Sequence, residues 1–232
     1  MEQPPTVVRR IGYSNVSLIV NGKRSILVDT GVKGNLKKIL RMFENYKLDP
    51  QDICLIILTH THYDHTGNLK ELKRLTGAPV LVHEMEYEYL KKGFMPIPNG
   101  QRIFMKLISM LGKLFVPWFA SPEPFNADLV NKGEYDLTPY GFSGKVIHTP
   151  GHSIGSQSVL LGNKVIAGDC FMNMAYGVVF PHFAEKPTIL LESWRKLFDL
   201  GIEEIIPGHG KLLKVDKAKR VFEKWKNKLN CK

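Results

Sequence analysis

Metal binding is the chemistry that the histidines of this chain suggest first. Five of its eight histidines fall in four short segments, which also carry two aspartates. The segments read LTHTHYDHTG at 58–67, TPGHS at 149–153, AGD at 167–169 and IPGHG at 206–210. Their side chains of metal-binding type are His60, His62, Asp64, His65, His152, Asp169 and His209. Imidazole nitrogen and carboxylate oxygen are usual ligands of Zn2+, and Fe2+ or Mn2+ can occupy similar sites.

The four segments share a position in the predicted secondary structure. Each directly follows a short run that is typical of a strand, at residues 53–58, 145–148, 164–167 and 203–206. Strand ends of one sheet system can converge on a single place, so we expect the side chains to meet there. Taken singly, each has an ordinary explanation: a histidine at a strand end is often only a polar residue, Asp64 could cap a helix and Asp169 could stand in a turn. The ordered set of four favours a metal site.

The spacing within the first segment predicts two adjoining metal positions. Residues two apart in an extended chain share a face, so His60 and His62 can bind one ion. Asp64 and His65 stand beyond a turn, where they would serve a neighbouring position. A bridging carboxylate, Asp169, could then hold two cations about 3.5–4 Å apart, as in two-metal hydrolytic sites.

The elements that position these segments alternate between strands and helices. Asn21-Gly22 and Gly162-Asn163 each predict the turn of a hairpin. Further strands are expected at 16–20, 25–28, 79–83 and 156–161, and helices at 34–46, 68–75, 188–200 and 214–230. Strands joined both by hairpins and by helices indicate an α/β fold with sheets in the middle and helices outside.

Residues 84–124 interrupt this alternation. They contain no obvious strand, and their middle, 103–119, is an apolar, methionine-bearing stretch with helical spacing. We expect an apolar helical insert that forms a flap over one end of the molecule, a helix docked on the core, a dimer surface or a membrane contact. Lys106 and Lys113 divide the stretch, so no transmembrane segment is predicted.

The composition indicates a globular chain with a basic surface. Its 232 residues are 44% hydrophobic and 23% charged, which excludes fibrous and disordered classes. The 32 Lys and Arg outnumber the 22 Asp and Glu. The resulting charge of +10 could serve an anionic partner, but the scattered basic pairs favour a solvated helix surface as its cause. The three cysteines form no metal or redox motif, and the first residues lack the apolar run of a secretory signal. We therefore expect a cytoplasmic protein.

The set of motifs resembles the metallo-β-lactamase superfamily. The resemblance runs from about Tyr13 to Gly210, and Val28-Asp29-Thr30-Gly31 is similar to the family's early Asp-Thr-Gly segment, whose aspartate supports the site. The resemblance implies a four-layer αβ/βα sandwich, with residues 1–232 as a single domain that carries the insert. It also implies one metal bound by His60, His62 and His152 and another bound by Asp64, His65 and His209, with Asp169 bridging.

The resemblance further implies a binuclear metal-dependent hydrolase that uses a hydroxide between two divalent cations. Zn2+ is the expected metal, with Fe2+ and Mn2+ as alternatives. Asp64 would orient the hydroxide, and Tyr176 and His182 are candidates for contact with the substrate. True β-lactamases of this fold are exported and usually carry Cys or Ser in place of the bridging aspartate, so Asp169 argues against that activity.

The apolar insert suggests the class of substrate. It suits a small ester, thioester or lactone with a hydrophobic moiety, whereas nucleases of the superfamily carry a basic, glycine-rich arm. A nuclease or phosphodiesterase that uses the positive charge is the second interpretation, with nucleic acid as its partner. A non-catalytic metal-binding module for sensing is the third. The insert also leaves open a homodimer formed through its apolar surface.

Overall fold

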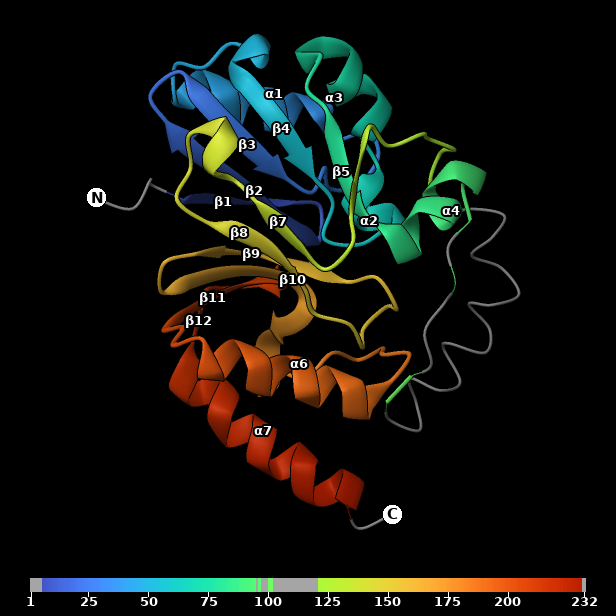
Figure 1. The fold of residues 1–232 in the computed structure, drawn as a ribbon, viewed down its shortest axis with the longest axis vertical. Helices are drawn as coiled ribbons and strands as arrows, with labels where there is room; N and C mark the ends of the chain where they lie inside the picture. The colour runs from blue at the N-terminus through green and yellow to red at the C-terminus, as the bar shows by residue number, and fades with distance from the viewer. Residues whose placement is uncertain (1–5, 95, 97–99, 102–120, 231–232) are drawn as a thin grey trace.

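The computed structural model describes residues 6–94, 96, 100–101 and 121–230. Within them the chain forms two six-stranded sheets (Figure 1). The first, in spatial order, contains β1 (Thr6–Ile11), β2 (Ser14–Asn21), β3 (Arg24–Val28), β4 (Ile53–Ile57), β5 (Val80–His83) and β6 (Leu129–Asn131). The second contains β12 (Leu213–Lys214), β11 (Glu204–Gly210), β10 (Lys164–Asn173), β9 (Gln157–Leu161), β8 (Lys145–His148) and β7 (Glu134–Asp136).

Helices cover the outer face of each sheet (Figure 1). The longer ones are α1 (Leu36–Asn45), α3 (Leu69–Thr76), α4 (Glu84–Lys92), α6 (Pro187–Asp199) and α7 (Val215–Asn230). Shorter turns are α2 (Tyr63–Thr66) and the 3-10 turns η1 (Pro50–Asp52), η2 (Thr138–Tyr140) and η3 (Ala175–Gly177).

Three apolar clusters hold the layers together. Phe43 of α1 and Leu72 of α3 pack on the first sheet, and Trp194 of α6 packs on the second. The third cluster lies between the sheets, where Ile57 of the first and Ile166 of the second are both buried. Apolar residues on both faces of both sheets explain why their strands read as continuous hydrophobic runs. The layers run helix, sheet, sheet, helix, which confirms the predicted four-layer αβ/βα sandwich.

The helices and strands predicted within the described residues are confirmed, and the structure adds strands that the sequence did not predict. The Asn21-Gly22 hairpin pairs β2 with β3, and Asn21 lies opposite Arg24. Four strands were not predicted: β1, β6, β7 and β12. The last three span only two or three residues, so pairing with a neighbouring strand orders them and no local pattern announces them.

Two strands extend further than predicted. β10 and β11 continue to Asn173 and Gly210, so Asp169 and His209 lie inside strands instead of just beyond them. The register of this parallel pair shifts on both sides of Gly168, which has a φ of 48°. A Cβ at Gly168 would lie 2.4 Å from Oγ1 of Thr59. Glycine therefore lets β10 bend against the first sheet at the residue before Asp169.

The predicted insert at 84–124 lies only partly within the described residues. Its first part is helix α4, which ends at Gly93 with a φ of 62°. The apolar stretch 103–119 falls outside the described residues, and so do the expected flap, dimer surface and membrane contact. Among the helices that are described, none combines the length and the apolar character that crossing a membrane requires.

Candidate metal centre

All seven predicted ligand side chains come together from the segments that follow β4 and β8 and from β10 and β11. They form two clusters, one of His60, His62, His152 and Asp169 and one of Asp64, His65 and His209. Within each cluster, one ligand atom per residue lies within 4.8 Å of the others. Every one of these side chains is buried.

The first segment supplies ligands to both clusters because its conformation changes at His62. The chain is extended up to His62, and the rings of His60 and His62 lie 4.4 Å apart between centroids. Helix α2 then begins at Tyr63 and carries Asp64 and His65 to the second cluster. The predicted turn between the two pairs of ligands is therefore the start of a helix.

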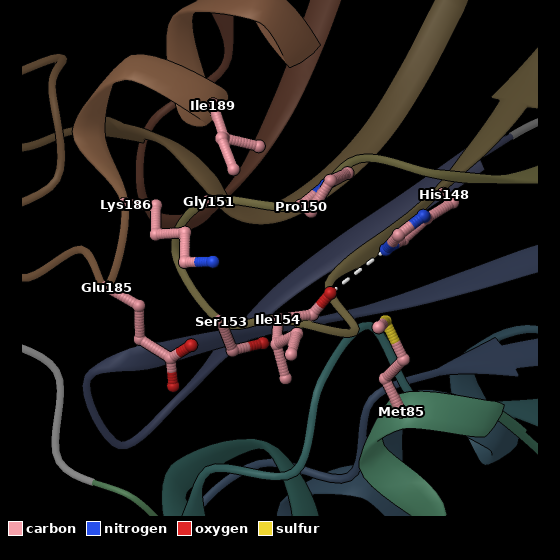
Figure 2. A pocket seen from close by; sticks show the side chains of 9 residues that line it. All are labelled: Met85, His148, Pro150, Gly151, Ser153, Ile154, Glu185, Lys186 and Ile189. Carbon is pink, nitrogen blue, oxygen red and sulfur yellow. Dashed lines mark hydrogen bonds between the residues drawn. The ribbon is translucent and has the colours of Figure 1, made fainter.

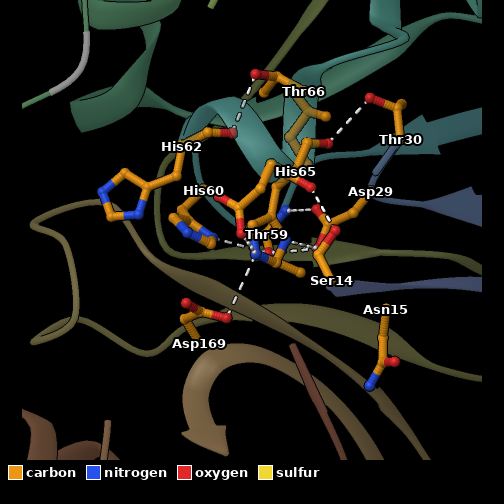
Figure 3. A network of polar contacts seen from close by, with 12 residues as sticks. Ser14, Asn15, Asp29, Thr30, Thr59, His60, His62, His65, Thr66 and Asp169 are labelled. Carbon is orange, nitrogen blue, oxygen red and sulfur yellow. Dashed lines mark hydrogen bonds and ion pairs between the residues drawn. The ribbon is translucent and has the colours of Figure 1, made fainter. Parts of the chain in front are cut away.

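Asp169 faces both clusters. Its Oδ2 lies 3.5 Å from Nε2 of His152 and 3.3 Å from Nε2 of His209. Its Oδ1 lies 3.3 Å from Nε2 of His65 (Figure 3). One carboxylate thus reaches histidines of both clusters, as a bridge between two cations requires.

Hydrogen bonds to the far ring nitrogen fix the orientation of three histidines. Each donates from Nδ1 to an oxygen: His65 to Asp29 Oδ2 at 2.7 Å, His152 to the Phe183 carbonyl at 2.9 Å and His209 to the Tyr13 carbonyl at 2.7 Å. A proton on Nδ1 leaves Nε2 with its lone pair facing the cluster, which is the arrangement of metal-binding histidines.

Asp29 supports this arrangement from outside both clusters. Besides its bond to His65, its carboxylate accepts hydrogen bonds from the backbone N–H of Thr59 at 2.7 Å and from Thr59 Oγ1 at 2.8 Å (Figure 3). Asp29 has a φ of 62°, a conformation that non-glycine residues rarely adopt. This strained residue directly follows β3. Its hydrogen bonds to Thr59 connect that strand to the segment 58–67, which carries four of the predicted ligands.

The residues present fit divalent metal ions. Nε2 of His60 and Nε2 of His62 are buried, and neither has a hydrogen-bond partner among the described residues. Burial and the neighbouring histidines lower the pKa of His62 to about 3, so this imidazole is neutral, as a ligand must be. At His209, Asp169 and Asp64 outweigh burial and raise the pKa to about 10. The same carboxylates would attract a metal cation at that position.

The two predicted substrate contacts have different surroundings. Tyr176 stands on η3 with a fully exposed side chain, so it is neither packed in the core nor in contact with the clusters. His182 is half-buried, and its carbonyl accepts a hydrogen bond from the N–H of Gln101 at 2.8 Å. Its neighbour Phe183 provides the carbonyl that orients His152.

Sequence reasoning missed two tyrosines beside the second cluster. Tyr13 stands between β1 and β2, and its ring stacks on His209 with centroids 6.0 Å apart. Its hydroxyl bonds to the hydroxyl of Tyr63, which follows His62 in the sequence. The place of Tyr63 within the HTHYDH motif was the available signal, whereas Tyr13 had none because β1 was not predicted.

A small cavity lies beside the loop that carries His152 (Figure 2). Its volume is about 200 Å³, and Gly151 and Ser153, on either side of His152, are part of its wall. The rest of the wall combines the apolar Met85, Pro150, Ile154 and Ile189 with the titratable His148, Glu185 and Lys186. Burial and the nearby carboxylate of Glu86 raise the pKa of Glu185 to about 6.

The sequence of this chain is similar to those of known proteins. A family model described as the metallo-beta-lactamase superfamily matches residues 9–209. A protein of Methanocaldococcus jannaschii named "Probable metallo-hydrolase MJ0888" is 30% identical over 206 residues, which cover 87% of this chain and 90% of that protein.

Solved structures share the fold. The archaeal metallo-beta-lactamase superfamily protein ST1585 from Sulfolobus tokodaii has a TM-score of 0.66 and 23% identity, covering 96% of this chain and 86% of that one. The protein TTHA1623, solved in a di-iron-bound form, has a TM-score of 0.65 and 24% identity, covering 94% and 98% of the two chains.

Proposed function

Since this chain belongs to the metallo-beta-lactamase superfamily, we propose that it is a hydrolase that depends on two divalent cations. The observation that carries the proposal is the pair of buried clusters joined by Asp169. The relative from M. jannaschii, itself named a probable metallo-hydrolase, supports the same reaction class.

The proposed ligands divide between the two positions as the clusters do. One position would be held by His60, His62 and His152 and the other by Asp64, His65 and His209, with Asp169 between them. Divalent cations bound there would act as Lewis acids and lower the pKa of a coordinated water, which is the chemistry that hydrolysis requires. Zn2+ suits this set of nitrogen and oxygen ligands, and Fe2+ and Mn2+ accept similar sets.

Asp64 is the residue that we expect to orient the attacking water and accept its proton. Its Oδ2 lies 3.3 Å from Nε2 of His209, and its backbone carbonyl accepts a hydrogen bond from Oγ of Ser14 at 2.5 Å. Burial alone would raise the pKa of Asp64, but His65 and His209 hold it below its usual value. A fixed, ionised carboxylate can serve as a general base.

Tyr13 and Tyr63 would stabilise charge on the substrate. Burial is the main cause that raises the pKa of both hydroxyls, so both keep their protons at neutral pH. A protonated hydroxyl beside the second cluster can donate a hydrogen bond to an oxygen that becomes negative during the reaction. The partly exposed side chain of Tyr13 is accessible to a substrate that enters from solvent.

The proposed substrate is a small ester, thioester or lactone with a hydrophobic moiety. Met85, Pro150, Ile154 and Ile189 in the wall of the cavity beside His152 support an apolar group at this end of the molecule. The charge of +10 supports the second candidate, a phosphodiesterase or nuclease.

One experiment tests these alternatives together. The metal content of protein purified without added metal is measured, and turnover is assayed with an aliphatic thioester, a lactone, a glutathione thioester and bis-p-nitrophenyl phosphate. We expect close to two metals per chain and turnover of a carbonyl substrate. Cleavage of the phosphodiester alone would favour the second candidate, metal without any turnover would favour a sensing module, and protein that binds no metal would refute the ligand assignment.

A further inference from the structure

Glu86 carries a buried carboxylate that lies outside both clusters. It stands in the first turn of α4 and is only 1% exposed. Its Oε2 accepts hydrogen bonds from the backbone N–H of Thr61 at 3.1 Å and from the Thr61 hydroxyl. Its Oε1 accepts a hydrogen bond from the backbone N–H of Gly155, also at 3.1 Å. All three donors are uncharged groups of the protein.

The two partners of Glu86 belong to the segments that carry the histidines of the first cluster. Thr61 lies between His60 and His62, and Gly155 lies three residues after His152. The two segments come from different sheets and are far apart in sequence. A single carboxylate therefore ties together the backbone of all three histidines of one metal position.

Other groups orient the histidines of the second metal position. His65 donates to Asp29 and His209 donates to the carbonyl of Tyr13. Neither of these bonds involves Glu86. Glu86 thus supports the first position through bonds that the second position does not share, whereas Asp29, which also binds Thr59 beside His60, and Asp169 serve both.

The packing around Glu86 leaves little freedom for it to move. A Cβ at Gly155 would lie 2.5 Å from Cγ of Glu86 and 3.0 Å from its backbone nitrogen. Glycine at position 155 therefore permits the close approach that the hydrogen bond requires. The start of α4 is itself fixed, because the N–H of Met85 donates to Nδ1 of His83 at 3.3 Å.

We propose that Glu86 is a positioning residue that sets the affinity of the metal bound by His60, His62 and His152 without setting the affinity of the other metal. The inference rests on the proposed binuclear site. Among the described residues Glu86 has no cationic partner, and a buried carboxylate without one costs free energy that a cation at the first position would offset. The three hydrogen bonds also hold the histidines at the spacing that a metal requires, a support that in other metal sites is worth about 10- to 100-fold in affinity.

The test compares Glu86→Gln with Glu84→Gln. Glutamine has nearly the same size, but it removes the charge and turns an NH2 group toward one of the N–H donors. Glu84 lies two residues away in the same helix turn with an exposed side chain, so its variant matches the loss of charge at the helix N-terminus. Zinc dissociation constants are measured by competition with a chromogenic chelator in the full chain, first with both positions present.

Each position is then measured alone. His209→Ala disables the second position and keeps the first, which contains His152. His152→Ala disables the first position and keeps the second. Each variant is combined with Glu86→Gln. We expect Glu86→Gln to weaken zinc binding about 10- to 100-fold in the His209→Ala background and to leave it unchanged in the His152→Ala background. Glu84→Gln should change neither.

Several outcomes would overturn the inference. Equal weakening in both backgrounds would make Glu86 a general structural residue, and unchanged affinity in both would leave it without a role at the metal. If Glu86→Gln does not fold, Thr61→Val, which removes one of the three donors, should produce a smaller loss confined to the first position, and an unchanged affinity there would refute the inference. Wild-type protein that binds fewer than two metals would instead contradict the proposed function itself.

Discussion

At the residue scale, Asp64 is the side chain on which the proposed reaction most directly depends. Asparagine keeps an oxygen that can bind a metal but cannot accept a proton at neutral pH. We expect Asp64→Asn to lower kcat by about 10²- to 10⁴-fold at matched metal content, the usual contribution of a general base. Turnover and metal content are measured on the same preparation, with Asp199→Asn, an exposed aspartate at the end of α6, as control. Undiminished turnover with a full complement of metal would exclude this role for Asp64.

At the element scale, the close approach of β10 and β11 depends on Gly208. A Cβ there would lie 2.0 Å from Oδ1 of Asp169, a side chain that faces both clusters. We expect Gly208→Ala to displace Asp169 and to lower the metal content below one per chain. Gly144→Ala is the matched control, because its Cβ would crowd the carbonyl of Leu160 at 2.5 Å but no proposed ligand. It should lower stability and keep both metals, and equal metal loss in the two variants would contradict this explanation.

The stacked pair of His83 and His148 joins the two sheets and predicts a loss of stability in acid. Their ring centroids lie 3.9 Å apart, with His83 at the end of β5 and His148 at the end of β8. Burial and His148 lower the pKa of His83 to about 4. The unfolded chain, with an ordinary histidine pKa near 6.5, therefore binds this proton more readily than the folded chain. The contribution of neutral His83 to the free energy of unfolding is therefore complete above about pH 6.5 and is lost as the pH falls toward 4.

His83→Asn tests this element without removing the cap of α4, because asparagine can also accept the N–H of Met85. We expect the metal-free variant to lose less stability than metal-free wild type between pH 7 and pH 5, by on the order of 1–2 kcal/mol. Urea unfolding at the two pH values measures the difference. An identical pH dependence in the two proteins would show that His83 does not titrate on unfolding.

At the scale of the whole molecule, the proposed metals cross-link the two sheets. His60 and His62 follow a strand of the first sheet, whereas His152 and His209 belong to the second. Because metals that bind only the folded state stabilise it, removing them should lower the free energy of unfolding by about 3–4 kcal/mol per site at metal concentrations 100 to 1,000 times the dissociation constant. Urea unfolding with and without a chelator measures this. An unchanged midpoint after complete metal removal would mean that the sheets do not depend on the metals.

The sequence identified what local chemistry determines and missed what long-range contacts determine. The four candidate ligands of the HTHYDH motif could be predicted because they lie within six consecutive residues, where their types and spacing are visible in the sequence. Asp169 and His209 could be predicted as ligand types, although the strands that hold them extend further than their apolar runs indicate. Glu86 could not be found this way, since its partners lie 25 and 69 positions away and one glutamate on a helix has the pattern of any solvated residue.

The bond from His209 to Tyr13 has a consequence for how the protein would exchange its metals. Tyr13 sits at the tip of the hairpin between β1 and β2, and β1 is an edge strand of its sheet. Opening of this edge would release the acceptor that orients His209, whereas the supports of the first cluster come from α4 and the interior of the molecule. We expect protein dialysed against metal-free buffer to pass through a long-lived species that has lost one ion from the second cluster and retains the other.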